Sequence, residues 1–345
     1  MSKFAFVFPG QATQYVGMGM ELAARYREAS AVYEQANDLM GLDLRQLCRD
    51  GPESELLRTE ISQPTIHTTT LAILKVVERY GFAAKVTAGF SLGEYAALVY
   101  AGVFRFEDTL RLVQQRGLFM QNAVPQGLGK MCSISGLARA TVERIVEEAT
   151  DQGLIECSNF NCPDQTIVAG LARAVEKAAM LASERGATAT TFLNVSGPFH
   201  TSLLQGAGAQ LHELLRSVPL GQAHKRVLSN VTASYLSPDD DIRRLLAEHV
   251  YKPVRWQECV NTMLDDGVDT FVEIGPKRSL TSYNQNTAAQ RGIAVRCFSI
   301  ENIETLEVFL RAMEADRRPS TDQSPPGHDG VAALNGLALS TQSAH

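Results

Sequence analysis

The most reactive pattern in the sequence is Gly89-Phe90-Ser91-Leu92-Gly93, which matches the G-x-S-x-G nucleophile elbow. In such an elbow the glycines let a strand and a helix approach closely, while the serine hydroxyl is exposed in a strained turn. The N–H of Leu92 would supply one donor of an oxyanion hole. Ordinary loops also match this pattern, so its meaning depends on the strand, turn and helix around it.

A serine hydroxyl needs a base to take its proton, and His200 is the best-placed histidine for that role. His200 ends the segment SGPFH, in a loop that joins two predicted subdomains, where catalytic side chains are commonly displayed. By contrast, His212 falls on an ordinary predicted helix, and His67 at a predicted helix start fits a surface or packing role. No Asp stands out as a third member, so a backbone carbonyl could hold the imidazole N–H in a Ser-His dyad.

Two further positions could complete such a site. The turn Pro9-Gly10-Gln11 follows the first predicted strand and could supply the second oxyanion donor, although it also fits a plain strand-to-helix turn. Arg116 lies in a polar stretch of a predicted helix, where arginines are usually exposed. Turned into a cleft instead, its guanidinium would bind a substrate carboxylate through two hydrogen bonds.

Composition excludes several other kinds of function. The chain has 345 residues, of which 45% are hydrophobic, with 32 Lys and Arg against 38 Asp and Glu and a net charge of -6. This balance argues against a nucleic-acid partner. The start lacks the pattern of a signal peptide and no long apolar segment occurs, so we expect a cytoplasmic protein without membrane contact. The six cysteines lack metal-ligand spacing and are interpreted as buried or incidental thiols, and no metal is expected.

The elements that must position these residues alternate between strands and helices. Apolar runs at 4–9 and 86–90 predict buried strands, and helical periodicity covers 18–48, 65–80 and 106–124. This alternation is typical of a parallel α/β sheet. The order of elements between 126 and 196 is strand, helix, strand, strand, helix, strand, which predicts a ferredoxin-like insertion.

After the insertion, the chain returns to the larger subdomain. Helical patterns at 201–216, 239–249 and 255–266 alternate with strand candidates at 226–230 and 270–275, and a last helix is expected at 303–315. We therefore predict a large subdomain formed by 1–125 and 197–315, with the small subdomain at 126–196. Residues 316–345 are rich in Ser, Pro, Gly and Asp at first and predict a disordered tail.

Several motifs together resemble those of the malonyl-CoA:acyl-carrier-protein transacylase family of fatty acid and polyketide synthesis. They are FVFPGQ, GFSLGEYAAL, QQRGLFMQ, NFN and GPFH, in the family's order and at compatible spacing over about residues 3–310. The resemblance implies an α/β-hydrolase-like large subdomain with a ferredoxin-like insertion. It also implies a malonyltransferase with no bound cofactor, which takes malonyl-CoA as donor and the phosphopantetheine thiol of an acyl carrier protein as acceptor, and which we expect to be a monomer.

The resemblance assigns a role to each candidate. Ser91 matches the acylated nucleophile and His200 the general base. Arg116 matches the clamp on the malonyl carboxylate, and Gln11 with Leu92 match the oxyanion-hole amides. In such enzymes the serine takes the malonyl group from CoA and passes it to the carrier thiol in a ping-pong cycle.

Three more positions match the family with some departures. Gln63 and Asn161 match polar residues that line the pocket, and His249 stands where the family usually has Gln or Asn, whose main-chain carbonyl orients the base. Phe90 replaces a His that is common in fatty acid synthesis, which makes the chain resemble the discrete acyltransferases of polyketide pathways. GPFH resembles malonyl-type rather than methylmalonyl-type members.

Two other functions remain to be weighed against the transferase. An acyl hydrolase of the same fold would remove stalled acyl groups from carrier proteins, but such relatives typically lack the clamp arginine. A catalytically idle subunit that only docks carrier proteins is the other alternative, and the presence of both Ser91 and His200 argues against it.

Overall fold

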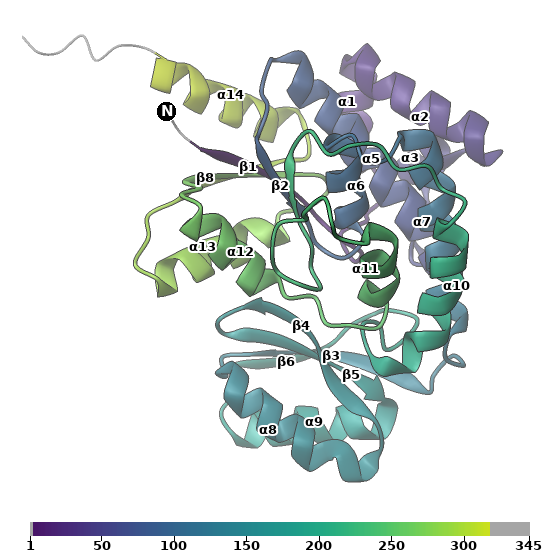
Figure 1. Ribbon diagram of the computed structural model, residues 1–345, viewed down its shortest axis with the longest axis vertical. Coiled ribbons are helices and arrows are strands. Elements are labelled where there is room, and N and C mark those ends of the chain that lie inside the picture. The colour runs from purple at the N-terminus through teal and green to yellow at the C-terminus, as the bar shows by residue number, and fades with distance from the viewer. Residues whose placement is uncertain (1–2, 318–345) are drawn as a thin grey trace, which may run out of the picture.

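The computed structural model describes residues 3–317 and divides into two sheets with their helices (Figure 1). The larger sheet has five parallel strands in the order β7-β2-β1-β8-β9. Its strands are β1 (Phe4–Phe8), β2 (Val86–Gly89), β7 (Arg226–Leu228), β8 (Thr270–Ile274) and β9 (Arg296–Ile300). The middle strands are buried along nearly their whole length because helices cover both faces of the parallel sheet.

Helices of the large subdomain pack around this sheet. Before the insertion they are α1 (Met20–Arg25), α2 (Arg27–Met40), α3 (Leu44–Asp50), α4 (Glu53–Leu56), α5 (Thr59–Arg79), α6 (Gly93–Tyr100) and α7 (Phe106–Asn122). After it they are the 3-10 turn η2 (Ser202–Leu204), α10 (Gln205–Leu215), α11 (Ile242–His249), α12 (Trp256–Asp265), α13 (Ser279–Gln290) and α14 (Ile303–Arg317).

The smaller sheet is antiparallel, in the order β4-β5-β3-β6. Its elements are β3 (Gly129–Ser135), α8 (Arg139–Ala149), the 3-10 turn η1 (Thr150–Gln152), β4 (Ile155–Cys162), β5 (Gln165–Leu171), α9 (Ala172–Glu184) and β6 (Ala189–Phe192). Both helices cover one face, where Cys132 and Ile134 of β3 join their apolar core. This topology confirms the predicted α/β fold with a ferredoxin-like insertion.

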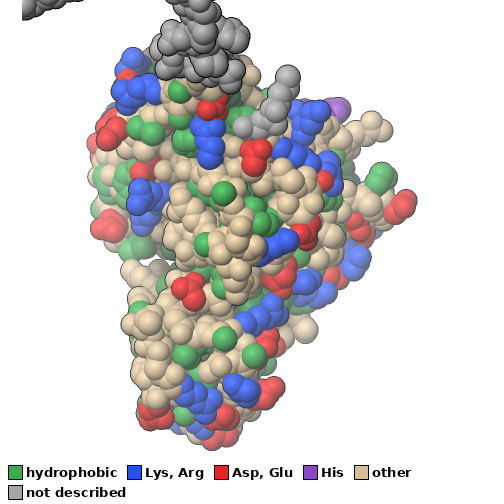
Figure 2. Space-filling model, turned by 90° about the vertical axis from the view of Figure 1, so that its left-hand side faces the viewer, with side chains coloured by type: hydrophobic (Ala, Val, Ile, Leu, Met, Phe, Trp, Pro, Cys, Tyr) green, Lys and Arg blue, Asp and Glu red, His purple; other side chains and the backbone are tan. Residues whose placement is uncertain are grey.

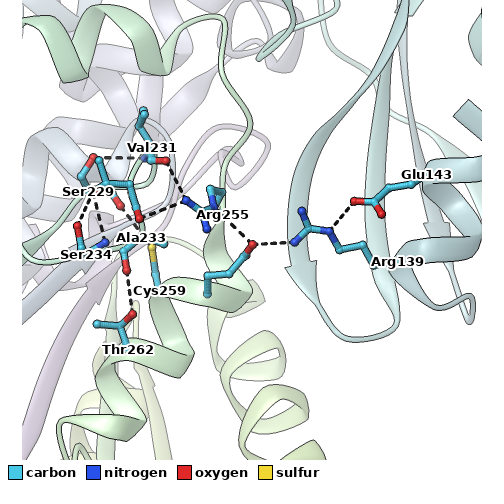
Figure 3. A network of polar contacts seen from close by, with 11 residues as sticks. Arg139, Glu143, Ser229, Val231, Ala233, Ser234, Arg255, Cys259 and Thr262 are labelled. Carbon is cyan, nitrogen blue, oxygen red and sulfur yellow. Dashed lines mark hydrogen bonds and ion pairs between the residues drawn. The ribbon is translucent and has the colours of Figure 1, made fainter. Parts of the chain in front are cut away.

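The two sheets meet along β4. Val254 of the large subdomain forms a bridge with Asn159, supported by backbone hydrogen bonds from Phe160 N to Val254 O and from Val254 N to Ser158 O, both 2.9 Å. Arg139 of α8, labelled in Figure 3, also donates to Glu258 of α12 at 2.7 Å. The insertion is therefore fixed to the large subdomain by main-chain and side-chain contacts.

Three elements differ from the expectation. α5 begins at Thr59 rather than 65 and contains Pro64 in its second turn, where the missing N–H removes one intrahelical hydrogen bond. Packing that buries nearly the whole helix overrides this cost. α13 and β9 were not expected. β9 is a half-buried edge strand, so its hydrophobic pattern is weak.

The predicted subdomain boundaries at 126 and 197 stay a prediction, and most of the predicted tail lies outside the described residues. On the face shown in Figure 2, Lys and Arg side chains are mixed with Asp and Glu. Among residues 3–317 no helix is both long and apolar enough to cross a membrane.

Candidate active site

Ser91 lies in the turn between β2 and α6, as the elbow pattern predicts. Its φ is 51°, and two glycines make the turn possible. A Cβ on Gly89 would lie 1.9 Å from Gly93 C, and one on Gly93 would lie 2.1 Å from Phe8 O. Any larger residue at either position would push the strand and helix apart, so both glycines are required by close approach.

The imidazole of His200 contacts the serine directly. Its Nε2 lies 2.8 Å from Ser91 Oγ, and its Nδ1 lies 2.7 Å from the carbonyl oxygen of His249. A carbonyl only accepts hydrogen bonds, so Nδ1 must carry the proton and Nε2 must present its lone pair to the serine hydroxyl. The geometry is that of a serine activated by a neutral base.

The environment keeps this imidazole uncharged. Burial, followed by the nearby His249 imidazole and the charge of Arg116, lowers the pKa of His200 well below its usual value. At neutral pH the ring can therefore accept the serine proton.

Arg116 is almost fully buried and contacts the nucleophile. Its Nη2 donates to Ser91 Oγ at 3.1 Å, and its Nη1 donates to Gln63 Oε1 at 2.9 Å. Its Nε has no hydrogen-bond partner among the described residues. A buried unpaired donor is costly. The Nε and Nη2 edge, beside the reactive oxygen, is therefore suited to a carboxylate that binds with two oxygens.

The turn after β1 lies beside the elbow. A Cβ on Gly10 would be 2.6 Å from Phe90 O, so this glycine permits close contact between the two turns. Within residues 3–317, the backbone N–H groups of Gln11 and Leu92 have no hydrogen-bond acceptor. Two free amides next to a nucleophile are the donors that an oxyanion hole requires.

A cavity of about 370 Å³ opens in front of Ser91 and His200, between the two sheets. The small subdomain contributes alternate residues of each strand, which share one sheet face. Asn161 is one of them, and its Nδ2 donates to Gln165 Oε1 at 2.8 Å, while its buried Oδ1 has no hydrogen-bond partner in the described part of the chain. The other small-subdomain residues that line it are Met131, Ser133, Ser135, Asn159, Gln165, Ile167, Thr191, Leu193 and Val195.

The structure brings the sequence-predicted residues together with one difference. Arg116 and Gln63 lie behind the cavity wall rather than on it, and Gln63 contributes by holding the guanidinium. Other histidines lie elsewhere: His67 is buried against Thr109, and His212 is exposed on α10. His67 lies within α5 rather than at a helix start. Among the described residues no cluster of His, Cys, Asp and Glu could hold a metal ion.

Sequence reasoning missed two buried polar residues behind the dyad. Asn230 accepts the N–H of Ser91 at 2.9 Å and donates to Gly89 O at 2.7 Å. Glu94 is 2% exposed and lies 3.0 Å from His249 Nδ1. An acid directly after the elbow was a visible signal for Glu94, whereas Asn230 follows an edge strand far away in the sequence.

Comparisons with known proteins agree with this geometry. The family model "Acyl transferase domain" matches residues 5–314. A curated relative, the malonyl CoA-acyl carrier protein transacylase of Bacillus subtilis, is 37% identical over 317 residues, 92% of this chain and 99% of its own.

Solved structures give the same result. The malonyl CoA-acyl carrier protein transacylase of Clostridium perfringens superposes with a TM-score of 0.87 at 36% identity, covering 91% of this chain and 98% of its own. A malonyl-transacylase in complex with a type II polyketide synthase acyl-carrier protein has a TM-score of 0.86 at 36% identity, covering 90% and 100%. The chain therefore belongs to the acyl transferase family and, within it, to the malonyl-CoA:acyl-carrier-protein transacylases.

Proposed function

We propose that this chain moves a malonyl group from malonyl-CoA to the phosphopantetheine thiol of an acyl carrier protein through a malonyl-Ser91 intermediate. One observation carries the mechanism: Ser91 Oγ lies 2.8 Å from the base His200 Nε2 and 3.1 Å from the cation Arg116 Nη2. A nucleophile between a neutral base and a carboxylate-binding group suits an acyl donor that bears a free carboxylate.

In the first half-reaction Ser91 Oγ attacks the malonyl thioester carbon while His200 Nε2 takes the hydroxyl proton. The amides of Gln11 and Leu92 stabilise the oxyanion, and the tetrahedral intermediate collapses as the C–S bond breaks. The proton then passes to the CoA thiolate. In the second half-reaction the carrier thiol gives its proton to His200 and attacks the ester, and Ser91 Oγ recovers a proton as it leaves.

The malonyl carboxylate would bind the free edge of Arg116. The guanidinium already contacts Ser91 Oγ, so an acyl group attached to that oxygen would hold its own carboxylate close to Nε and Nη2. Asn161, on the opposite wall, presents a buried Oδ1 without a partner that could accept a hydrogen bond from the substrate.

The test is the intact mass of the protein after brief incubation with malonyl-CoA, followed by addition of a holo carrier protein. Wild type and Ser217→Ala, an exposed serine, should gain one malonyl group and pass it to the carrier, whereas Ser91→Ala should gain none. Loss of the group to water at the same rate with or without carrier would identify an acyl hydrolase instead. No loading of wild type would contradict the proposal.

We further propose a role in polyketide synthesis. Phe90 supports it, because an apolar residue before the nucleophile makes the chain resemble the discrete acyltransferases of polyketide pathways. Its ring lines the cavity and packs against Trp256 and Tyr283, with ring centroids 5.7 and 6.3 Å apart. Transfer rates to a polyketide carrier protein and to a fatty acid carrier protein would test this role. Equal or faster transfer to the fatty acid carrier would overturn it.

A further inference from the structure

Five residues form a closed ring of contacts around the proposed dyad. Ser91 Oγ meets His200 Nε2 at 2.8 Å, and His200 Nδ1 meets the His249 carbonyl at 2.7 Å. The His249 imidazole lies 3.0 Å from Glu94 Oε2, measured from Nδ1. The same oxygen accepts the N–H of Asn230 at 3.3 Å, and Asn230 Oδ1 accepts the N–H of Ser91 at 2.9 Å.

Glu94 lies where this ring joins separate parts of the fold. It follows the elbow in the first turn of α6, His249 ends α11, and Asn230 comes shortly after β7. One Glu94 carboxyl oxygen therefore contacts two residues. The carbonyl of His249 holds the base, and the side chain of Asn230 holds the backbone N–H of the nucleophile. Within residues 3–317, the His249 side chain has no other polar partner.

One of the two facing atoms, Glu94 Oε2 or His249 Nδ1, must carry a proton. A carboxylate oxygen and an unprotonated ring nitrogen would repel each other at 3.0 Å. Burial raises the pKa of Glu94 to about 8, and burial followed by the charge of Arg116 lowers the pKa of His249. Burial therefore favours the neutral carboxyl group, and the neutral imidazole can also place its own N–H on Nδ1. The contact lacks the alignment of a hydrogen bond. Because the two atoms are only 3.0 Å apart, removing the Glu94 carboxyl group would leave a gap beside the His249 ring.

We propose that Glu94 is a positioning residue, whose buried carboxyl group connects His249 with Asn230 and thereby keeps Ser91 Oγ and His200 Nε2 at reacting distance. Glu94 touches neither substrate nor the reacting atoms. The sequence showed no acidic third member beside the Ser-His dyad. Glu94 is a buried acid near the dyad, but it acts through His249 and Asn230. This inference rests on the proposed Ser91–His200 pair and deepens it.

The test measures the reactivity of Ser91 with a fluorophosphonate probe, which needs neither malonyl-CoA nor a carrier protein. In that reaction the Oγ–P bond forms, fluoride leaves, and the hydroxyl proton goes to His200 Nε2. We expect Glu94→Ala to lower the second-order rate constant about 100-fold, because displacement of reacting groups by about 1 Å has effects of that size. Glu94→Gln, whose amide oxygen can still accept the Asn230 N–H and face a protonated His249 Nδ1, should recover most of the rate.

Glu273→Gln is the matched control. Glu273 is also a fully buried glutamate, but it accepts the N–H groups of Leu280 and Thr281 at the start of α13 and does not contact the ring. It should lower the melting temperature and change the probe rate by less than about threefold. Equal rates for Glu94→Ala and this control, or a rate for Glu94→Gln as low as that for Glu94→Ala, would overturn the inference.

If Glu94→Ala does not fold, Asn230→Ala provides the second variant, because it breaks the same ring at the bond to Ser91 N–H. A folded Asn230→Ala protein with an unchanged probe rate would also overturn the inference. Because the probe bypasses both substrates, a protein that transfers no malonyl group but reacts normally with the probe would contradict the proposed function and leave the ring intact.

Discussion

The two walls of the cavity differ in kind. The large subdomain supplies the proposed nucleophile Ser91, the base His200 and, just behind the wall, the buried cation Arg116. The small subdomain supplies only uncharged side chains, among them Asn161 and Gln165. We interpret this difference as a division of labour in which the large subdomain carries out the chemistry and binds the malonyl carboxylate, while the small-subdomain wall lines the rest of the substrate site.

If the division holds, removing the base should have the largest effect. His200→Ala should lower the rate of malonyl-Ser91 formation by about 10³- to 10⁴-fold, the upper range for general acid–base catalysis. Rapid-quench mass spectrometry measures that rate. His212→Ala, which removes an exposed histidine on α10, is the control and should load normally. A drop of less than tenfold in His200→Ala would mean that another group acts as base.

Loss of the cation should have the next largest effect. Arg116→Ala should lower malonyl loading about 100-fold, because a hydrogen bond to a charged group contributes up to about 3 kcal/mol. The kcat/KM for donors of neutral acyl groups, such as acetyl-CoA, should rise relative to the kcat/KM for malonyl-CoA. The measurement is kcat/KM for malonyl-CoA and acetyl-CoA.

The control for this variant is Arg111→Ala, an exposed arginine on the same helix, which should leave both values near those of wild type. Unchanged malonyl loading in Arg116→Ala would show that the guanidinium does not hold the carboxylate.

A substitution on the small-subdomain wall should affect binding more than chemistry. Asn161→Ala should raise KM for malonyl-CoA about fivefold, the effect of losing one net hydrogen bond of about 1 kcal/mol, with kcat within about twofold of wild type. Steady-state kinetics measures both, and the exposed Gln152→Ala in the same subdomain is the control. A fall in kcat with constant KM would remove the distinction between the two walls.

Mild acid should have the smallest effect. The pKa of His200 is lowered by burial and by His249 and Arg116, so the imidazole stays unprotonated below the usual histidine pKa of about 6.5. An ordinary histidine would be about 90% protonated one unit below that value. Ser91 acylation should therefore lose much less than tenfold between pH 7.5 and 5.5. A tenfold loss would show that the environment does not depress this pKa.

The sequence predicted the reactive residues of the large-subdomain wall better than the buried polar residues behind them. The elbow was visible because Gly89, Ser91 and Gly93 are adjacent and each is required by local backbone geometry. Family motifs carried the assignment of Arg116 and His200. Asn230 and Glu94 were missed because their role depends on long-range contacts, which join residues more than 130 positions apart in the chain.

Secondary structure was likewise predicted well where the local pattern was strong and poorly where tertiary packing decided the outcome. Strands with continuous apolar runs, such as β1 and β2, were predicted within a residue of their observed ends. The half-buried β9 was missed because burial on an edge leaves little periodicity. The start of α5 was misplaced because tertiary packing, which buries nearly the whole helix, overrides the local effect of Pro64.

The small sheet is one uninterrupted stretch of chain whose two ends lie together, since a Cβ on Gly129 would be 2.4 Å from Pro198. For protein engineering, this makes the small-subdomain wall of the cavity a segment that could be exchanged as one unit. A stretch such as 129–192 from a relative with another substrate could be transplanted without altering any residue of the ring around Ser91. The graft would need to keep a strand able to bridge Val254 and a cation facing Glu258, which join the segment to the rest of the enzyme.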